Sequence, residues 1–337
     1  MRCPSLAELP PPPAGRSGWP WTEETPRRAV DPALAPRITI VTPSYMQGEF
    51  LEETIRSVLL QGYPDLEYFI LDGGSTDASR AIIGKYEPWL AGWRCSRDGG
   101  QPAAVNEGWA RATGEIVAWI NSDDWYLPGA FATIASAFEN GKTAWVSGAV
   151  DDCDQHGKFL KRHAAAPTPF ANCLTRQNYG YFQPGMFWRR ALLQSVGPLE
   201  TSLEYGFDHE FWIRSLLAGY EMVALPEPLV CFRLHLGSKS GVLFHRQMRD
   251  DWEIFRRYRQ HLPAGERGRA ASALRHYEAE YFIPAIYRML LAGRRGQALW
   301  CMLRSFRLIP HLRRPQVWLG ALLRTVFTGR PPAWFAR

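Results

Sequence analysis

From residue 37 onward, apolar runs alternate with segments whose apolar residues are spaced as on one face of a helix. The runs are short and rich in β-branched residues, which is typical of buried strands. They predict strands at residues 38–41, 68–71, 115–120 and 143–150. The spaced segments predict helices at residues 50–60, 77–86 and 103–113, and a further helix that starts at Pro128. This alternation predicts an α/β fold, with a mostly parallel sheet flanked by helices and right-handed crossovers.

Polar residues gather where three of these strands end. Pro43-Ser44-Tyr45 follows the first strand, Asp72 ends the second, and Ser122-Asp123-Asp124 follows the third. In open α/β sheets, ligands bind at the carboxyl ends of the parallel strands. The pattern therefore predicts a binding site at this edge of the sheet.

Two interpretations fit Asp123 and Asp124 when the pair is taken alone. Adjacent carboxylates at a strand end suit a hard divalent cation, which takes oxygen ligands and shares them with substrate phosphates. Asp and Ser also favour turns, so a plain turn is the more frequent outcome for such a pair.

Composition narrows the class of protein. Of 337 residues, 46% are apolar and 21% are charged, which is typical of a globular chain. The six cysteines are scattered without paired spacing, so we expect neither a thiolate zinc site nor a disulfide framework. The sequence lacks GxGxxG, GxxxxGK[ST], HExxH and GxSxG motifs, which disfavours dinucleotide oxidoreductases, P-loop enzymes, zincins and α/β-hydrolases. We expect neither a secretory signal nor a membrane-spanning helix.

The two ends of the chain differ from its middle. Residues 1–36 contain nine prolines and predict an extended arm, whose Trp19 and Trp21 favour docking on a surface. Residues 281–337 carry ten arginines and no acidic residue, although the whole chain has a net charge of only +6. This basic tail, with Leu299, Met302 and Leu303 beside Arg304, predicts an amphipathic helix.

Three hypotheses account for the basic tail. It can be a helical cap that packs on the rest of the chain, a segment that contacts anionic lipid, or a nucleic-acid-binding segment. No recognition motif supports the third, and we expect no nucleic-acid partner.

A long series of motifs occurs in order between residues 37 and 240. They are TPSY (42–45), LEETIRSVLLQ (51–61), DGGSTD (72–77), DGGQ (98–101), AVNEG (104–108), WINSDD (119–124), DHEFWIR (208–214) and FRLH (232–235). Together they resemble glycosyltransferase family 2, the inverting enzymes of GT-A fold. The resemblance implies a Rossmann-like catalytic domain at residues 37–245, after the arm of residues 1–36 and before a basic helical extension at residues 246–337.

The resemblance also implies roles for individual residues. Asp72 matches the carboxylate that reads the nucleotide base, although Gly73 follows it where the family often has a second acid. The remaining implied donor-binding residues are Thr42, Pro43, Tyr45, Asp98 and Asp123. Asp124 and Asp123 match the family's DxD-type metal motif, and His235 matches a loop histidine that can be a third ligand of Mn²⁺ or Mg²⁺. A surface loop histidine is an equal alternative for His235.

Asp208 matches the family's catalytic base, although Phe207 stands where a Glu is usual. Glu210 is the alternative base, and a helix N-terminal acid without catalytic role is the structural alternative. Gln183, Gly185 and Met186 are expected on the acceptor side, where an aromatic hairpin is the plain alternative.

The predicted activity is metal-dependent, inverting transfer of a sugar from a UDP- or dTDP-sugar to a glycan or lipid-linked acceptor. We expect a cytoplasmic protein, peripheral at the inner face of the cytoplasmic membrane if the tail binds lipid. Two alternatives are a degenerate GT-A protein that binds a nucleotide sugar or a partner, and a nucleotidyltransferase. The second needs a basic glycine-rich loop after the first strand, and residues 42–50 contain no Lys or Arg.

Overall fold

The computed structural model describes residues 3–26, 35–235 and 244–291, together with positions 293, 296, 298, 303 and 320. The chain divides into two compact units. The first unit consists of Met1–Pro167, Gly180–Ser202 and Glu210–Arg233, and the second of Thr168–Tyr179, Leu203–His209 and Leu234–Arg337. The domain boundaries that the sequence predicts at residues 36 and 245 stay predictions.

A single sheet of nine strands forms the centre of the described part of the first unit. Its strands are β1 (Ile38–Ser44), β2 (Leu66–Asp72), β3 (Gly92–Cys95), β4 (Ile116–Trp119), β5 (Trp125–Tyr126), β6 (Trp145–Asp154), β7 (Phe159–His163), β8 (Met186–Arg189) and β9 (Val223–Leu234). Their order is β3-β2-β1-β4-β8-β6-β9-β5, with β7 paired to β6.

The sheet has a parallel half and an antiparallel half. β1 runs parallel to β2 and β4, and β2 runs parallel to β3. β8 pairs antiparallel with β4 and with β6, and β5 pairs antiparallel with β9. The α/β class is confirmed, and the strands predicted from the sequence correspond to β1, β2, β4 and β6.

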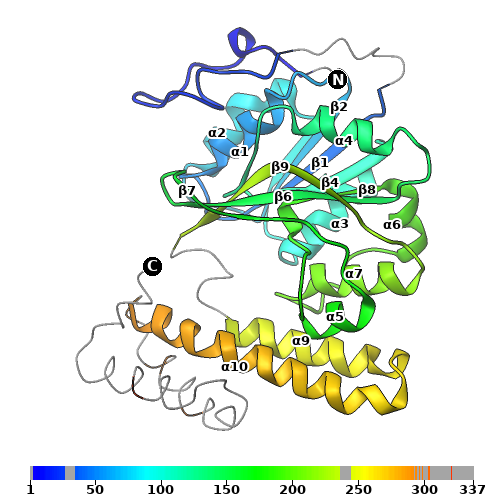
Figure 1. Ribbon diagram of the computed structural model, residues 1–337. Helices are drawn as coiled ribbons and strands as arrows, with labels where there is room; N and C mark the ends of the chain where they lie inside the picture. Colours follow the sequence, from blue (N-terminus) through cyan, green and yellow to red (C-terminus); the bar gives the residue numbers. More distant parts are fainter. Residues whose placement is uncertain are drawn as a thin grey trace. The chain divides into compact units, whose positions relative to one another are not determined.

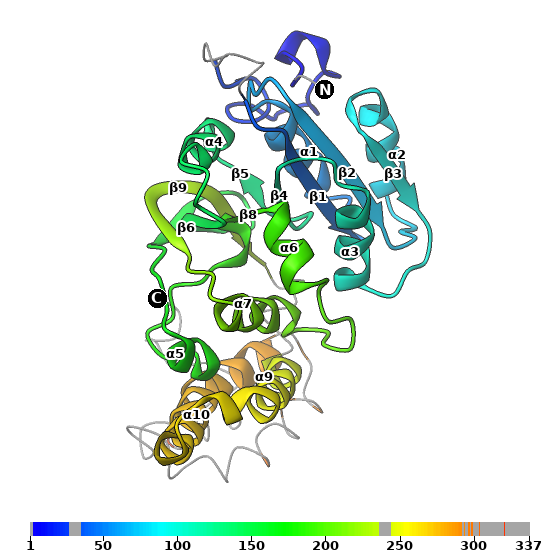
Figure 2. The ribbon, with the colours of Figure 1, turned by 90° about the vertical axis from the view of Figure 1, so that its right-hand side faces the viewer.

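Helices cover both faces of this sheet. α1, α2 and α4 lie on one face, and α3 and α6 lie on the other (Figures 1 and 2). Their bounds are α1 (Leu51–Leu59), α2 (Ser79–Tyr86), α3 (Gln101–Arg111), α4 (Ala130–Phe138) and α6 (Arg190–Val196), and α7 (Phe207–Leu217) continues from the second unit into the first. Asp77 was predicted to cap α2; the N-cap is Ala78, and Asp77, one residue earlier, accepts the N–H of Ser79 at 3.0 Å.

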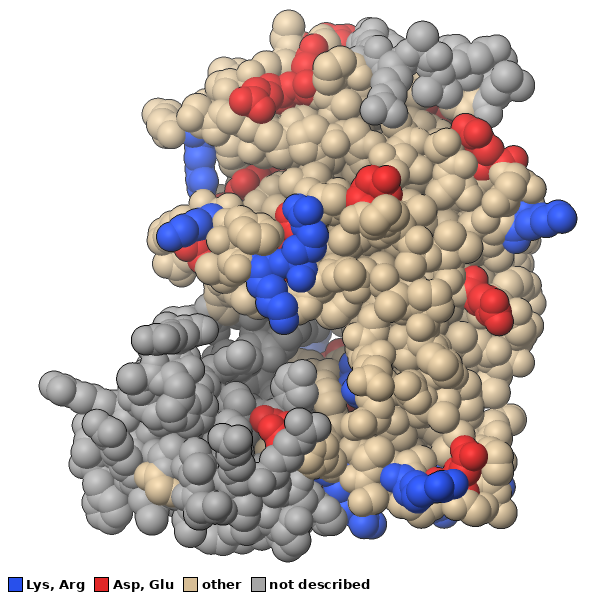
Figure 3. Space-filling model, viewed as in Figure 1, with Lys and Arg blue, Asp and Glu red and all other residues tan. Residues whose placement is uncertain are grey.

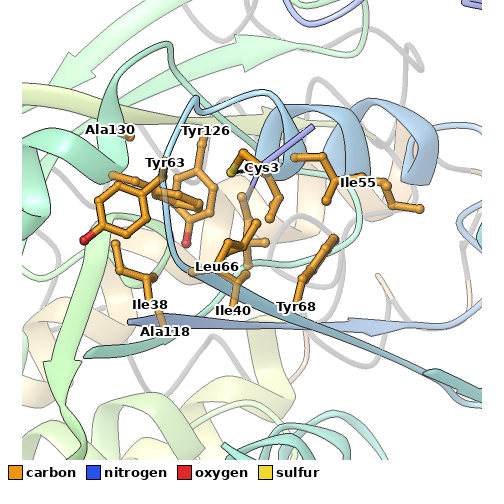
Figure 4. Close-up of a cluster of buried hydrophobic side chains, with 14 of the residues drawn as sticks. Cys3, Ile38, Ile40, Ile55, Tyr63, Leu66, Tyr68, Ala118, Tyr126 and Ala130 are labelled. Atoms are coloured by element: carbon orange, nitrogen blue, oxygen red, sulfur yellow. Dashed lines mark hydrogen bonds between the residues drawn. The ribbon is translucent and has the colours of Figure 1, made fainter. Parts of the chain in front are cut away.

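The main hydrophobic core lies between the sheet and α1. Alternate residues of β1, Ile38 and Ile40, point to the same face and pack with Ile55 of α1 (Figure 4). Cys3 from the N-terminal arm belongs to this buried cluster as well, so the arm contributes to the core.

The other face of the sheet carries α3 and a buried aromatic cluster. A Cβ at Gly108 of α3 would stand 2.5 Å from a methyl group of Val41, so only glycine allows this close approach to β1. Trp119 of β4 and Trp188 of β8 stack with ring centroids 5.0 Å apart and an interplanar angle of 8°. Trp109 and Phe211 pack against this pair.

The arm docks through its tryptophans, as the sequence predicts. Trp19 donates its indole N–H to the carbonyl of Tyr126 at 2.8 Å. Arg56 of α1 is fully buried, and its guanidinium donates to the carbonyls of Pro10, Pro20 and Trp21. The arm therefore supplies the acceptors that a buried cation requires.

β7, which pairs with the buried strand β6, is an exposed part of the first unit. Basic side chains gather over β7, where Lys158, Lys161 and Arg162 lie in or beside the strand (Figure 3). Charged residues at the edge of a sheet discourage pairing with other chains.

The described part of the second unit is helical, with α5 (Phe170–Thr175), α9 (Phe244–Tyr258) and α10 (Arg267–Leu291). No helix among the described residues is long and apolar enough to cross a membrane. The helix predicted beyond Tyr281 is observed as far as Leu291, the end of α10. Of residues 299–306 only Leu303 is described, so that part of the prediction lies outside the described residues.

Candidate active site

The tips of β1 and β2 meet at the carboxyl edge of the sheet. Ser44 is in register with Asp72, and Thr42 exchanges a buried hydrogen bond of 2.9 Å with the hydroxyl of Tyr68. Pro43 is buried, whereas Tyr45 is 64% exposed. Tyr45 therefore presents a free ring face at the position where the sequence predicts a nucleotide base.

The Asp72 carboxylate points into the protein. Its oxygens accept the N–H groups of Gly74 and Ser75 at 3.0 and 2.7 Å, and the Ser75 hydroxyl at 2.7 Å. The Cys95 thiol is a further donor, at 3.2 Å. Asp72 is fully buried, so in this structure its carboxylate shapes the loop that follows β2.

Asp98 lies against Gly73. A Cβ at Gly73 would stand 3.5 and 3.6 Å from the two Asp98 carboxylate oxygens and 3.3 Å from the Tyr45 ring. Arg94 donates to one Asp98 oxygen at 3.0 Å, and the N–H of Gly100 donates to the other at 2.8 Å. A Cβ at position 73 would therefore be in ordinary van der Waals contact with the Asp98 carboxylate. Arg94 was not singled out from the sequence, although its position four residues before Asp98 is a signal.

Asp124 is buried between two hydrogen-bond donors. Its Oδ1 accepts the backbone N–H of Arg233 at 3.0 Å, and its Oδ2 lies 3.4 Å from the Asn121 amide nitrogen. Burial, together with the negative charge of neighbouring Asp123, raises the pKa of Asp124 well above its usual range.

The Arg233 side chain holds the backbone of the Asp123–Asp124 turn. Its guanidinium is almost fully buried, lies over the rings of Phe50 and Trp125, and donates to the carbonyl of Asp123 at 2.9 Å. A further nitrogen donates to the carboxylate of Glu53 in α1 at 2.9 Å. Residues 232–235 were noted as a motif, but this role of Arg233 could not be inferred from their spacing.

An amide network joins the loop of Asp98 to the Asp123–Asp124 turn. Gln101, at the start of α3, donates to Asn121 at 2.7 Å. Asn121 in turn donates to Gln183 at 3.3 Å, and Gln183 donates to the carbonyl of Trp119 at 2.9 Å. The first unit therefore brings the predicted base pocket, the paired carboxylates and Gln183 together at one edge of the sheet.

The other expected acceptor residues are more deeply placed. Met186 is buried in β8, and a Cβ at Gly185 would stand 2.8 Å from the carbonyl of Gly148. Glu210 is buried, and Arg214 donates from its Nε to both Glu210 carboxylate oxygens at 2.9 Å.

Asp208 and His235 belong to the second unit. Asp208 is the second residue of α7, is partly buried, and accepts the N–H of His209 at 2.6 Å. Burial raises the pKa of Asp208, while the charges of Arg176 and His209 lower it. His235 is partly buried and is the last described residue before position 244.

The paired carboxylates fit a divalent cation by their chemistry. They supply hard oxygen ligands, and burial together with the charge of Asp123 raises the pKa of Asp124, a cost that a bound cation would offset. Among the described residues, no group of three or more His, Cys, Asp or Glu side chains could hold a metal ion by itself. A cation at this turn would therefore share its coordination with substrate oxygens.

Comparisons with known proteins point to a family of glycosyltransferases. Residues 39–197 match the family model of glycosyl transferase family 2. The uncharacterized glycosyltransferase alr2836 of Nostoc sp. is 29% identical over 174 residues, which are 49% of this chain and 54% of that protein. The putative teichuronic acid biosynthesis glycosyltransferase TuaG of Bacillus subtilis is 36% identical over 92 residues, 26% of this chain and 36% of that protein. The chain thus spans about half or less of the length of these relatives.

Solved structures share the fold at low identity. The mannosyltransferase PcManGT from Pyrobaculum calidifontis, in complex with GDP-Man and Mn²⁺, has a TM-score of 0.55 and 18% identity, with 90% of each chain covered. S. aureus TarS 1-349, in complex with UDP-GlcNAc, has a TM-score of 0.53 and 15% identity, with 86% of this chain and 88% of that chain covered. Residues 39–197 of the chain are therefore similar to glycosyltransferase family 2, and the structure shares the GT-A fold of these glycosyltransferases.

Proposed function

We propose that this protein is a metal-dependent, inverting glycosyltransferase. It moves a sugar from a UDP- or dTDP-sugar to a hydroxyl group of a glycan or lipid-linked acceptor in polysaccharide or glycolipid biosynthesis. The observation that carries the proposal is the grouping of Tyr45, Asp98 and the Asp123–Asp124 turn at one sheet edge, joined through Gln101 and Asn121. The similarity to TuaG, and to TarS as a complex with UDP-GlcNAc, supports this acceptor and donor class.

The donor nucleotide is assigned to the tips of β1 and β2. Asp98 accepts the imide N–H of uracil or thymine, because an ionised carboxylate is an acceptor only. The exposed Tyr45 ring stacks on the base. Asp72 holds the loop that follows β2, in which Gly73 leaves room for the base. Thr42 and Pro43 form the floor of this pocket, and Asp123 contacts the ribose.

The diphosphate is assigned to the paired carboxylates. Asp124 and Asp123 would hold Mn²⁺ or Mg²⁺ together with substrate oxygens, and as a Lewis acid the cation would neutralise the charge of the leaving diphosphate. His235 is the proposed further ligand, although among the described residues it forms no three-residue group with the two carboxylates. Arg233 keeps the backbone of this turn in place through the Asp123 carbonyl.

Asp208 is assigned as the general base. It takes the proton of the acceptor hydroxyl as that oxygen attacks the anomeric carbon, which is typically worth about 10²–10⁴-fold in rate. One displacement from the opposite face inverts the anomeric configuration, so no covalent nucleophile is required. Gln183, Gly185 and Met186 belong to the acceptor side, and Glu210 is the alternative base, although Arg214 already binds it.

A second candidate is a degenerate nucleotide-sugar-binding protein without turnover. The departures Gly73 and Phe207 from the family pattern favour it. The two functions predict the same ligand binding and differ only in the release of product.

The test combines binding and turnover. UDP, dTDP, GDP and ADP are each added with and without Mn²⁺, and thermal unfolding is followed. A ligand at 100 times its dissociation constant stabilises by about 2.7 kcal/mol. We expect stabilisation by UDP or dTDP with Mn²⁺, its loss in Asp124→Asn, and an unchanged response in the surface control Glu139→Gln.

Each outcome separates the candidates. Nucleotide release from a UDP- or dTDP-sugar supports the enzyme, whereas binding without release supports the degenerate binder. No stabilisation by any nucleotide would contradict both.

The basic extension at residues 246–337 gives a separate proposal. We propose that it makes peripheral contact with anionic lipid at the inner face of the cytoplasmic membrane. The ten arginines of residues 281–337 support it, since each basic residue near such a surface contributes about 1 kcal/mol. Cosedimentation of the full chain with vesicles that contain phosphatidylglycerol tests it, and protein that stays in the supernatant at low salt would contradict it.

A further inference from the structure

A chain of side-chain amides ends at the Asp124 carboxylate. Gln101, the first residue of α3, donates from its Nε2 to the Oδ1 of Asn121 at 2.7 Å. The Nδ2 of Asn121 lies 3.4 Å from the Oδ2 of Asp124 and 3.3 Å from the Oε1 of Gln183. The Nε2 of Gln183 in turn donates to the carbonyl of Trp119 at 2.9 Å. The carboxylate assigned to the cation is thus connected to a helix on the other side of the sheet edge through side chains alone.

The direction of each amide in this chain is fixed from one end. A backbone carbonyl only accepts, so Gln183 must turn its nitrogen toward Trp119 and its oxygen toward Asn121. Asn121 must then turn its nitrogen toward Gln183, and the two hydrogens of that nitrogen serve Gln183 and Asp124. The oxygen of Asn121 is left facing Gln101, which meets it with a donor. Reversing any one of these amides would bring two hydrogen-bond acceptors together.

Two donors set the plane of the buried Asp124 carboxylate, one on each oxygen. Its Oδ1 accepts the backbone N–H of Arg233 in β9 at 3.0 Å, a contact that no side-chain substitution at position 233 removes. Its Oδ2 faces the Asn121 amide, whose direction depends on the partners described above. An ionised carboxylate has about four acceptor sites, so these two bonds leave sites on both oxygens for a cation. The side-chain amide is therefore the variable part of the support for this carboxylate.

We propose that Gln101 is a positioning residue, which through Asn121 holds the Asp124 carboxylate in the direction that a cation requires. This inference rests on the proposed function, in which Asp124 is a metal ligand. If position 101 presented an acceptor in place of a donor, the Asn121 amide would have to turn round. Its oxygen would then face the oxygens of Asp124 and Gln183, and the carboxylate would lose its donor. A role in packing alone needs the shape of the Gln101 side chain but not the direction of its amide.

The first test uses Gln101→Glu, which keeps the side-chain shape and replaces the donor with an acceptor. Mn²⁺ binding to the full-length protein is measured with UDP present, from the electron paramagnetic resonance signal of free Mn²⁺. We expect the Mn²⁺ dissociation constant to rise by about 10–100-fold, as is typical when a partner of a metal ligand is lost. A negative charge added near a cation site would by itself tighten binding, so a loss identifies the turned amide. Unchanged or tighter Mn²⁺ binding overturns the proposal.

A neutral variant covers the case in which Gln101→Glu does not fold. Gln101→Met removes the donor without adding a charge, at a position that is partly exposed. We expect it to weaken Mn²⁺ binding as well, but by less than Gln101→Glu, because the Asn121 amide is no longer forced to turn. Mn²⁺ binding equal to that of the wild type in Gln101→Met contradicts the proposal.

The second test asks whether Gln101 acts through Asn121. We expect Asn121→Ala to raise the Mn²⁺ dissociation constant, and Gln101→Glu to add no further loss in that background, because residues of one network are not additive. Losses that multiply in the double variant contradict the proposal. Gln177→Glu is the matched control, since its amide also donates to a backbone carbonyl, that of Ala273 in the second unit. It should leave Mn²⁺ binding unchanged, and an equal loss there would assign the effect to the fold and overturn the proposal.

Asp124→Asn separates this inference from the proposed function. If Asp124→Asn binds Mn²⁺ as well as the wild type, or the wild type binds none with UDP, the proposed metal site fails and the positioning role fails with it. If Asp124→Asn loses Mn²⁺ binding and Gln101→Glu keeps it, the metal site stands and only the positioning role fails.

Discussion

The backbone N–H of Arg233 donates to the Asp124 carboxylate at 3.0 Å, although the two residues are 109 positions apart in the sequence. The last strand of the sheet thereby supports the turn that carries the paired carboxylates. The Arg233 side chain adds a second contact to the same turn, through the carbonyl of Asp123.

Replacing Arg233 with Met should lower the free energy of unfolding by about 3–5 kcal/mol, because it removes one partner of a buried ion pair with Glu53. Urea denaturation measures this. Arg37→Met breaks the more exposed pair with Asp65 and should cost about 1 kcal/mol or less. Equal losses of unfolding free energy in the two variants would contradict the assignment of this effect to the burial of Arg233.

Asp208→Asn should reduce kcat by about 10²–10⁴-fold if Asp208 is the base. Because burial raises the pKa of Asp208, we expect the acidic limb of the wild-type profile above the pH at which an ordinary aspartate titrates.

Stability gives the control for this variant. A raised pKa in the folded state means that the wild type loses stability as pH rises through it, and Asp208→Asn lacks that loss. The variant should therefore be at least as stable as the wild type at pH 7, measured by thermal unfolding. A much lower melting temperature would assign its inactivity to misfolding.

Asp98→Ala should weaken binding of the donor nucleotide by about 1.5–3 kcal/mol, since it removes a charged hydrogen-bond acceptor. Calorimetric titration with UDP and Mn²⁺ measures the change, which should appear in KM for the donor more than in kcat. Glu107→Ala removes the other carboxylate partner of Arg94 and is the matched control. If both variants bind equally poorly, Asp98 acts only through Arg94.

Deletion of residues 2–26 should lower the free energy of unfolding by about 3–5 kcal/mol, because Arg56 loses three carbonyl acceptors in a buried site. Arg56→Met should restore stability to the shortened chain and destabilise the full-length chain. Such a reversal of sign, followed by urea denaturation, distinguishes this contact from general loss of surface. Arg56→Met with the same effect in both backgrounds would contradict the assignment.

Local patterns predicted three of the four parallel strands, β1, β2 and β4, and missed β3, which has four residues. β1 and β2 are continuous apolar runs, and the helices between the parallel strands have one apolar face, so period and length alone identify them. Apart from β6, the antiparallel strands escaped prediction for identifiable reasons. β5 has only two residues. β9 contains Pro226 and Pro228, and prolines in a sequence indicate a loop, although here they lie within the strand.

The candidate site, too, was only partly predictable from the sequence. Positions at strand ends, such as Asp72 and Asp124, follow from the chain pattern. The direction of a carboxylate does not, because it depends on donors such as Ser75 and Arg233 that tertiary structure supplies. Likewise, the buried His209 ring is held by Asp251, 42 positions away.

The stacked indoles of Trp119 and Trp188 have an optical consequence. Two such chromophores at 5.0 Å couple their electronic transitions, and Trp119 ends the strand that leads into the Asp123–Asp124 turn. The near-ultraviolet circular dichroism of the unlabelled protein should therefore contain an exciton signal that reports on β4, so that ligand-induced rearrangement of this strand can be followed with no added dye.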